Sequence, residues 1–125
     1  MSIRASHISV GFIGEDIACK FLKKKGFKIL ERNINKKWGE LDIVVQDKRT
    51  KRIHIIEVKT VSGDFVSTQA HPVENLTRSK LDKLMRTSIL YTKENDIEDW
   101  QLDAVLVWWD QELKTVRVQY LEKVY

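Results

Sequence analysis

The sequence predicts an α/β domain in which two helices pack on a mixed β-sheet. Two helical patterns and five stretches of strand character follow one another in the order α-β-β-β-α-β-β. The 125 residues contain 42% hydrophobic and 32% charged side chains, with one proline and five glycines, which is typical of a globular chain. A chain of this length buries about two-thirds of its unfolded surface, so we expect a single domain over residues 1–125.

The first helix is expected over residues 10–25, where apolar residues recur at helical spacing: Val10, Ile13, Ile17, Ala18, Phe21 and Leu22. Gly26 follows three consecutive lysines, and both features are typical of a helix C-terminus. Glu15 is predicted to lie in the first turns, at the border of the apolar stripe. There it either only complements the helix dipole or also reaches a metal site at the edge of the sheet.

Residues 39–59 are typical of an antiparallel hairpin with a polar, basic turn. If this turn is symmetric, Asp42 faces Glu57 and Glu40 faces Lys59. Like charges opposite each other destabilise a sheet. A divalent cation between Asp42 and Glu57 would offset the repulsion, with Lys59 two residues further on the same face. The alternative is that these are solvated charges on an outer strand face, and a register slip of one residue would separate the two carboxylates.

Strand character also marks residues 27–34, before the hairpin, and residues 101–108 and 115–121 near the C-terminus. The segment 101–108 is apolar enough to lie inside the sheet, whereas 115–121 alternates as an edge strand does. Residues 60–76 show no clear periodicity and hold the only proline, so they are predicted to form a loop, which at this length is often functional.

The second helix is predicted to begin after a cap at Asn75 or Thr77. Lys80 lies near its start, where a positive charge opposes the helix dipole. An anion bound nearby would offset that cost. The alternative is an ordinary surface lysine whose stem packs on the protein.

Charge is distributed unevenly along the chain, whose formal net charge is +4. Residues 20–37 hold eight Lys or Arg and one acid, whereas residues 94–112 hold seven acids and no Lys or Arg. This asymmetry predicts a basic face that could meet a polyanion, and the alternative is a solvated helix end with exposed turns. Charge alone gives non-specific affinity and no activity.

The chain has one cysteine, so no internal disulfide can form and a reducing, cytoplasmic location is expected. Cys19 falls in the first helical pattern and is interpreted as a small core residue. The N-terminus lacks the apolar core of a signal peptide, and no apolar run approaches the ~18 residues of a membrane span. We therefore expect no membrane association.

Seven short motifs follow one another between Gly14 and about Val107. They are Gly14-Glu15-Asp16-Ile17-Ala18, Phe21-Leu22, Gly26-Phe27-Lys28-Ile29-Leu30-Glu31-Arg32-Asn33, Gly39-Glu40-Leu41-Asp42, Glu57-Val58-Lys59-Thr60, Pro72 and Lys80. Together they resemble the YraN-like family of the PD-(D/E)xK nuclease superfamily, a family related to archaeal Holliday-junction resolvases. The resemblance implies a restriction-endonuclease-like αβββαβ core with a mixed sheet flanked by helices, here with an extra C-terminal edge strand.

The resemblance also implies a divalent-metal-dependent nuclease that hydrolyses DNA phosphodiester bonds, with branched or junction DNA among its substrates. Asp42 and Glu57 would bind Mg²⁺ or Mn²⁺ with the backbone carbonyl of Val58. Glu15 would complete the metal site through water. A bound metal lowers the pKa of its water and neutralises charge on phosphate oxygens, so these residue types suit the reaction.

Two lysines have implied roles in the same reaction. Lys59 would orient or activate the attacking water and stabilise the transition state, and Lys80 would hold the scissile or an adjacent phosphate. Val61 stands where the family usually has arginine, which removes one phosphate contact. Further DNA contacts are expected from the basic cluster of Lys23, Lys24 and Lys25.

Two other classes of function stay open from the sequence. One is a non-catalytic nucleic-acid-binding module with the same fold, and the other is a structural subunit whose basic face meets a protein. A protein of any of these three classes could also form a homodimer. The set of Glu15, Asp42, Glu57 and Lys59 favours the enzyme, because binding alone needs no carboxylates near a phosphate.

Overall fold

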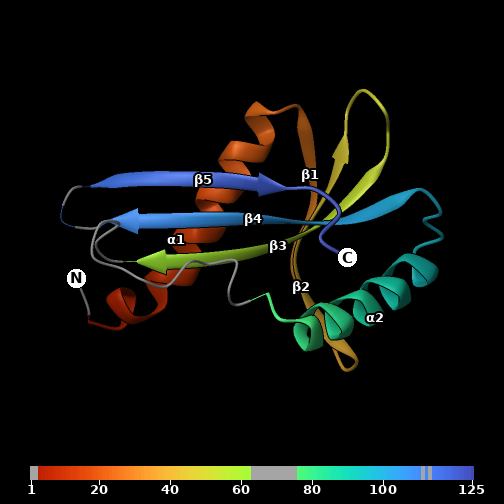
Figure 1. The fold of residues 1–125 in the computed structure, drawn as a ribbon, viewed down its shortest axis with the longest axis horizontal. Helices are drawn as coiled ribbons and strands as arrows, with labels where there is room; N and C mark the ends of the chain where they lie inside the picture. The colour runs from red at the N-terminus through yellow and green to blue at the C-terminus, as the bar shows by residue number, and fades with distance from the viewer. Residues whose placement is uncertain (1–2, 63–75, 111, 113) are drawn as a thin grey trace.

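The computed structural model describes residues 3–62, 76–110, 112 and 114–125, with side-chain surroundings from Ile13 onward except at Ser62. Two helices and five strands follow in the predicted order (Figure 1). Their bounds are α1 Ile3–Lys24, β1 Phe27–Lys36, β2 Gly39–Asp47, β3 Ile53–Ser62, α2 Arg78–Glu94, β4 Trp100–Asp110 and β5 Thr115–Leu121. Among the described residues, no helix is long and apolar enough to cross a membrane.

The five strands form one mixed sheet in the order β1-β2-β3-β4-β5. Strands β1, β2 and β3 pair antiparallel, β3 and β4 pair parallel, and β5 returns antiparallel to β4. The parallel pair needs a crossover, and α2 lies in that connection. The predicted mixed sheet and the predicted C-terminal edge strand are both confirmed.

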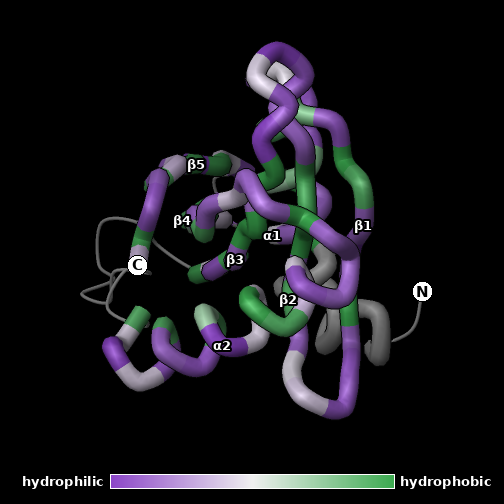
Figure 2. Tube along the Cα trace, turned by 90° about the vertical axis from the view of Figure 1, so that its right-hand side faces the viewer, coloured by the Kyte–Doolittle hydropathy of each residue, from purple (hydrophilic) through white to green (hydrophobic). Residues whose placement is uncertain are grey.

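Successive residues of a strand point to opposite faces of the sheet, and each helix packs on one of these two sets of residues. The two helices therefore cover opposite faces of the sheet. On one face, Leu22 of α1 packs with Ile43 and Ile56. On the other, Tyr91 of α2 packs with neighbours of those residues, Val44 and Ile55. The polar segments gather at the β1–β2 and β2–β3 turns, coloured purple in Figure 2.

Helix α1 begins at Ile3, seven residues before the predicted start. The prediction was wrong because residues 3–9 carry no apolar spacing, whereas extending an existing helix needs only one added hydrogen bond per residue. The C-terminus is as predicted: Gly26 takes φ +99° and donates to the Lys23 carbonyl at 3.1 Å. The predicted cap of α2 is also confirmed, because the Thr77 hydroxyl accepts from the Lys80 backbone N–H.

Two glycines bring the helices close to the sheet. A Cβ atom placed on Gly14 of α1 would overlap the Oγ1 atom of Thr60 on β3, and its Cβ and Cγ2 atoms would lie at 3.0 and 3.1 Å. A Cβ on Gly39, which has φ +154°, would overlap the Oγ1 atom of Thr87 on α2. Gly14 thereby sets the depth at which its neighbour Glu15 approaches the sheet.

We expect Gly14→Ala to destabilise the protein by about 1–3 kcal/mol, because overpacking at Thr60 outweighs the better helix propensity of alanine. Urea unfolding of Gly14→Ala, Thr60→Ala and the double variant measures this. The double variant should recover most of the loss, because it lacks the Oγ1 and Cγ2 atoms of Thr60. A Gly14→Ala protein as stable as wild type would contradict the close approach.

A buried polar network ties β5 and the C-terminus to the sheet. His54 Nδ1 lies 2.6 Å from Asp103 Oδ2, and the Tyr120 hydroxyl donates to the same carboxylate. Gln101 and the Lys123 backbone N–H donate to Asp103 Oδ1 at 2.8 and 2.9 Å. Burial alone would raise the pKa of Asp103, but these hydrogen bonds outweigh it and hold the pKa below its ordinary value.

Candidate active site

Asp42 and Glu57 lie where strands β2 and β3 separate. The β2–β3 ladder ends at the Ile43–Ile56 pair, and one residue further the same register sets Asp42 opposite Glu57. The predicted register is therefore confirmed over the ladder. Beyond this point β2 bends away from β3, as Figure 1 shows. The two carboxylates thus stand at a fork between the strands.

The side chains at this fork contact one another. Glu57 is hydrogen-bonded to Asp42, and Lys59 Nζ lies 3.4 Å from Glu57 Oε2. The Val58 backbone N–H donates to Asp42 Oδ2 at 2.8 Å and so orients that carboxylate. The side chains of Glu57 and Lys59 are only 18% and 27% exposed, so the structure does not place them as solvated charges on an outer strand face.

The pKa of Glu57 is raised from 4.5 to about 8. Burial is the main cause, followed by the hydrogen bond to Asp42 and the negative charge of Asp42, and Lys59 acts in the opposite direction. In the metal-free protein Glu57 therefore keeps a proton at neutral pH. A carboxyl pair that holds a proton in place of a second charge can exchange that proton for a cation.

Glu15 reaches the fork from α1. It lines a small cavity of about 210 Å³ together with Asp42 and Asn33. Burial and the charge of Asp42 raise the pKa of Glu15, and Arg32 partly offsets them. Glu15 lies in the middle of α1, so the prediction that it stands in the first turns was wrong, and helix-dipole complementation does not explain its place.

Two residues that sequence reasoning missed hold Glu15. Arg32 Nη2 lies 3.7 Å from Glu15 Oε1 and 2.9 Å from Asp16 Oδ1. When the Asn33 amide is turned to satisfy both of its polar atoms, its nitrogen donates to Glu15 Oε1 at 2.8 Å and to Oε2 at 3.2 Å. Asn33 has φ +51°, a left-handed conformation that asparagine tolerates better than most residues. Such conformations are frequent at functional sites.

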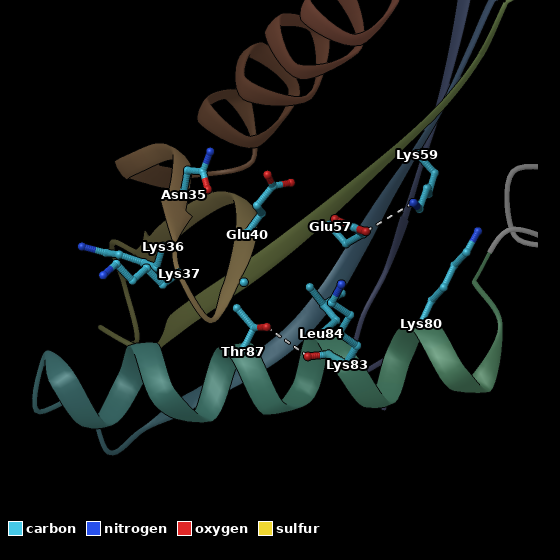
Figure 3. Close-up of a pocket in the computed structure, with 11 residues that line it drawn as sticks. Asn35, Lys36, Lys37, Glu40, Glu57, Lys59, Lys80, Lys83, Leu84 and Thr87 are labelled. Atoms are coloured by element: carbon cyan, nitrogen blue, oxygen red, sulfur yellow. Dashed lines mark hydrogen bonds and ion pairs between the residues drawn. The ribbon is translucent and has the colours of Figure 1, made fainter.

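A larger cavity of about 470 Å³ opens beside Glu57 and Lys59, between the sheet, the β1–β2 hairpin and α2. Lys80 and Lys83 of α2 line it, and Figure 3 shows both side chains rising from the helix toward the strand that carries Glu57 and Lys59. The structure thus brings Lys80 to the candidate site, as expected. Lys83 was not expected there.

Further cavity residues extend the basic surface beyond the fork. Lys36 and Lys37 also line the cavity, but in Figure 3 their side chains point away from Glu57. Glu40 adds an acidic group to the same wall.

The lysines predicted from the basic cluster lie elsewhere. Lys23 and Lys24 end α1, about 14 Å along the helix from Glu15 at 1.5 Å per residue. Lys25 Nζ lies over the rings of Phe21 and Tyr120, at 5.6 and 5.4 Å from their centres. A role of Lys23, Lys24 and Lys25 in DNA contact stays a prediction, and it concerns a surface separate from the cavity.

Val61, the departure from the family pattern, is half-buried on β3. It packs against the core cluster of Ala104, Leu106 and Trp108. Val61 therefore contributes to the packing of the core at this position.

The carboxylate pair fits a hard divalent cation. Within the described ranges, no group of three or more His, Cys, Asp or Glu side chains could hold a metal ion. Magnesium usually takes only one or two protein carboxylates and keeps several waters. Asp42 and Glu57 would supply these two, and Glu15 would contribute through water. The Val58 carbonyl is a further oxygen donor, because a strand residue directs its N–H and C=O to the same side and the Val58 N–H points to Asp42.

The αβββαβ order and the mixed sheet define an α/β protein with the restriction-endonuclease-like core predicted from the sequence. The chain belongs to the family described as "Uncharacterised protein family UPF0102", whose model matches residues 14–107. This is the YraN-like family expected from the motifs, and the match covers the same span.

Relatives of this family occur in distant bacteria. A UPF0102 protein of Campylobacter jejuni (strain RM1221) is 43% identical over 98 residues, which cover 78% of this chain and 81% of the relative. The UPF0102 protein of Campylobacter lari is 41% identical over 101 residues, covering 80% and 84%. The UPF0102 protein of Thermotoga petrophila is 44% identical over 84 residues, covering 67% and 71%.

Proposed function

We propose that this protein is a divalent-metal-dependent nuclease that hydrolyses phosphodiester bonds in DNA. The observation that carries the proposal is the carboxyl pair Asp42–Glu57 at the fork of β2 and β3, with Lys59 3.4 Å from Glu57, in a recess lined by further lysines. Paired, partly buried carboxylates beside lysines would not help a protein that only binds DNA, since the carboxylates repel the phosphate backbone. They suit a protein that also holds Mg²⁺ or Mn²⁺.

Each residue has a distinct task under this proposal. Asp42 and Glu57 would hold the metal, which supplies a nucleophilic water at neutral pH and neutralises charge on the phosphate. Lys59 is held in place by Glu57 and directs its ammonium to the cavity, where negative charge grows in the transition state. Lys80 meets a phosphate at the cavity wall. Glu15, fixed by Arg32 and Asn33, positions water at the fork.

The test is cleavage of labelled single-stranded, duplex, flapped and four-way-junction DNA with Mg²⁺ or Mn²⁺. We expect metal-dependent cutting of at least one form by wild type and none by Asp42→Asn, because the metal loses one of its two carboxylates. Purified wild type that binds DNA but cuts no form with either ion would replace the proposal by the binding-module alternative. Branched DNA as the preferred substrate would appear as faster cutting of the flap or junction.

A further inference from the structure

Lys83 lines the cavity, but the proposed reaction gives it no role. It follows Lys80 by three residues on α2, and Leu84 and Thr87 complete the face of the helix that lines the cavity. In Figure 3, the Lys83 side chain rises toward Glu57, and Lys80 rises beside Lys59. Three ammonium groups, those of Lys59, Lys80 and Lys83, therefore flank one recess.

Neither Lys80 nor Lys83 makes an ion pair with another residue in the part of the chain that the structure describes. The nearby acid on α2, Asp82, instead pairs with Arg78 at 3.4 Å and accepts a hydrogen bond from the Tyr125 hydroxyl.

The placement of these charges on α2 is also unfavourable for the helix alone. The first turn of α2 contains no acidic residue, and Arg78 and Lys80 stand at the positive end of the helix dipole. A bound anion would offset both the dipole and the mutual repulsion of the lysines. The helix thus carries an anion-binding arrangement that its own stability does not require.

The spacing of the two lysines matches a polymer of phosphates. Side chains at i and i+3 on a helix have Cβ atoms about 5–6 Å apart. Phosphates of one nucleic-acid strand advance about 3.4 Å along the duplex axis per nucleotide. Two flexible lysines at this separation can therefore reach two consecutive phosphates, which present one negative charge to each ammonium group.

We infer that Lys80 and Lys83 form a two-phosphate subsite on α2 that binds consecutive phosphates of one nucleic-acid strand beside the Asp42–Glu57 fork. This inference rests on the proposed function for its ligand class and deepens it. The site would take an internal stretch of a strand in preference to a group with a single phosphate. Lys83 is then a substrate-positioning residue, and Lys80 binds the phosphate nearer to Lys59.

The test compares Lys83→Ala with Lys93→Ala, a matched control that removes an exposed lysine from the same helix outside the cavity. Binding of a single-stranded 12-mer of deoxythymidine is titrated with salt in metal-free buffer. Lys83→Ala should weaken binding roughly tenfold, as expected for a lost charge-assisted hydrogen bond. It should also reduce the slope of log K against log salt by about 0.7. Lys93→Ala should change neither value.

A second measurement distinguishes binding at a two-phosphate subsite from non-specific attraction between the positive charges and DNA. Wild type should bind the trinucleotide TpTpT, with two phosphates, more tightly than the dinucleotide TpT, with one. Lys83→Ala should remove most of that difference, and circular dichroism should show that the variant is folded. Equal losses in Lys83→Ala and Lys93→Ala, or an unchanged preference for TpTpT in Lys83→Ala, would overturn the subsite. If both readouts succeed while wild type cuts no DNA, the nuclease proposal fails and the subsite stands.

Discussion

Replacing Lys59 by alanine is expected to lower the rate of DNA cleavage by about 10²–10³-fold, the usual effect of removing one preorganised group that stabilises transition-state charge. DNA affinity should change little, because one ammonium in a recess matters more when charge develops on the phosphate than in the ground-state complex. The side chain is already placed for this task, 3.4 Å from Glu57 and 27% exposed. Single-turnover cleavage beside binding of the same DNA measures the two effects separately.

The metal concentration must be saturating in that experiment. The positive charge of Lys59 lowers the pKa of Glu57 and also repels a cation at the carboxyl pair, so Lys59→Ala changes the affinity for the metal ion. Lys93→Ala is the control for a lost lysine at the surface. A Lys59→Ala protein that cuts as fast as wild type at saturating Mg²⁺ would remove Lys59 from the reaction.

A joint change of Lys23, Lys24 and Lys25 should show the reverse pattern if these lysines contact DNA. They lie at the far end of α1 from the fork, so they can contact only DNA that extends beyond the cavity. Binding of long DNA should weaken at all sequences, and its salt dependence should flatten by about one unit per lost phosphate contact. Unchanged salt dependence would show that the cavity lysines provide the main phosphate contacts.

The register of the β2–β3 hairpin was predictable from its short turn, because a symmetric turn fixes which residues pair. The apolar pattern alone could not fix the register, because Ile43 and Val44 are both buried, one on each face of the sheet. This register predicted that Asp42 lies opposite Glu57. The order of elements and the edge position of β5 were predictable for the same reason, since each rests on a local period.

The residues that hold Glu15 in place could not be predicted, because their contacts join segments that are far apart in the sequence. Asn33 takes φ +51° and turns to Glu15, but its local sequence carries no signal for a contact with a residue 18 positions earlier in the chain. Lys83 has one feature that could have been used: it follows Lys80 at i+3, so a role for one predicts the same face for the other.

One acid of the predicted acidic segment does not lie at the surface. Asp103 was included in the acidic segment 94–112, but it is fully buried and bonded to His54 and Tyr120. Its partners come from β3 and β5, 49 and 17 residues away in sequence. A buried network of this kind has no local signal, so sequence reasoning cannot separate it from surface charge.

Metal binding is expected to stabilise the protein, and more strongly at high pH than at low pH. In the metal-free protein the pKa of Glu57 is raised from 4.5 to about 8, so the folded state binds a proton that the unfolded state has released. Its contribution to stability is complete below pH 4.5 and is lost as pH rises through about 8. Metal-free wild type should therefore lose stability, of the order of a few kcal/mol, between about pH 5 and pH 9.

A cation at the Asp42–Glu57 pair would take the place of that proton. Its affinity should rise over the same pH range, because binding must release the proton. At about 100 times its Kd the ion adds roughly 2.7 kcal/mol to the free energy of unfolding. Thermal unfolding with and without Mg²⁺ or Mn²⁺ at pH 6 and pH 9 measures this, and the rise in Tm should be larger at pH 9.

Two variants test whether the stabilising ion binds at Asp42 and Glu57. Asp42→Asn removes the charge that repels Glu57, so it should flatten the loss of metal-free stability with pH and abolish the response to the ion. Glu98→Gln, which changes an exposed carboxylate outside both cavities, should behave as wild type. If wild type and Asp42→Asn respond alike to the ion, the cation binds elsewhere. In that case the fork between β2 and β3 holds a protonated Glu57 beside Asp42 without a metal, and a different source of nucleophilic water would be needed for hydrolysis.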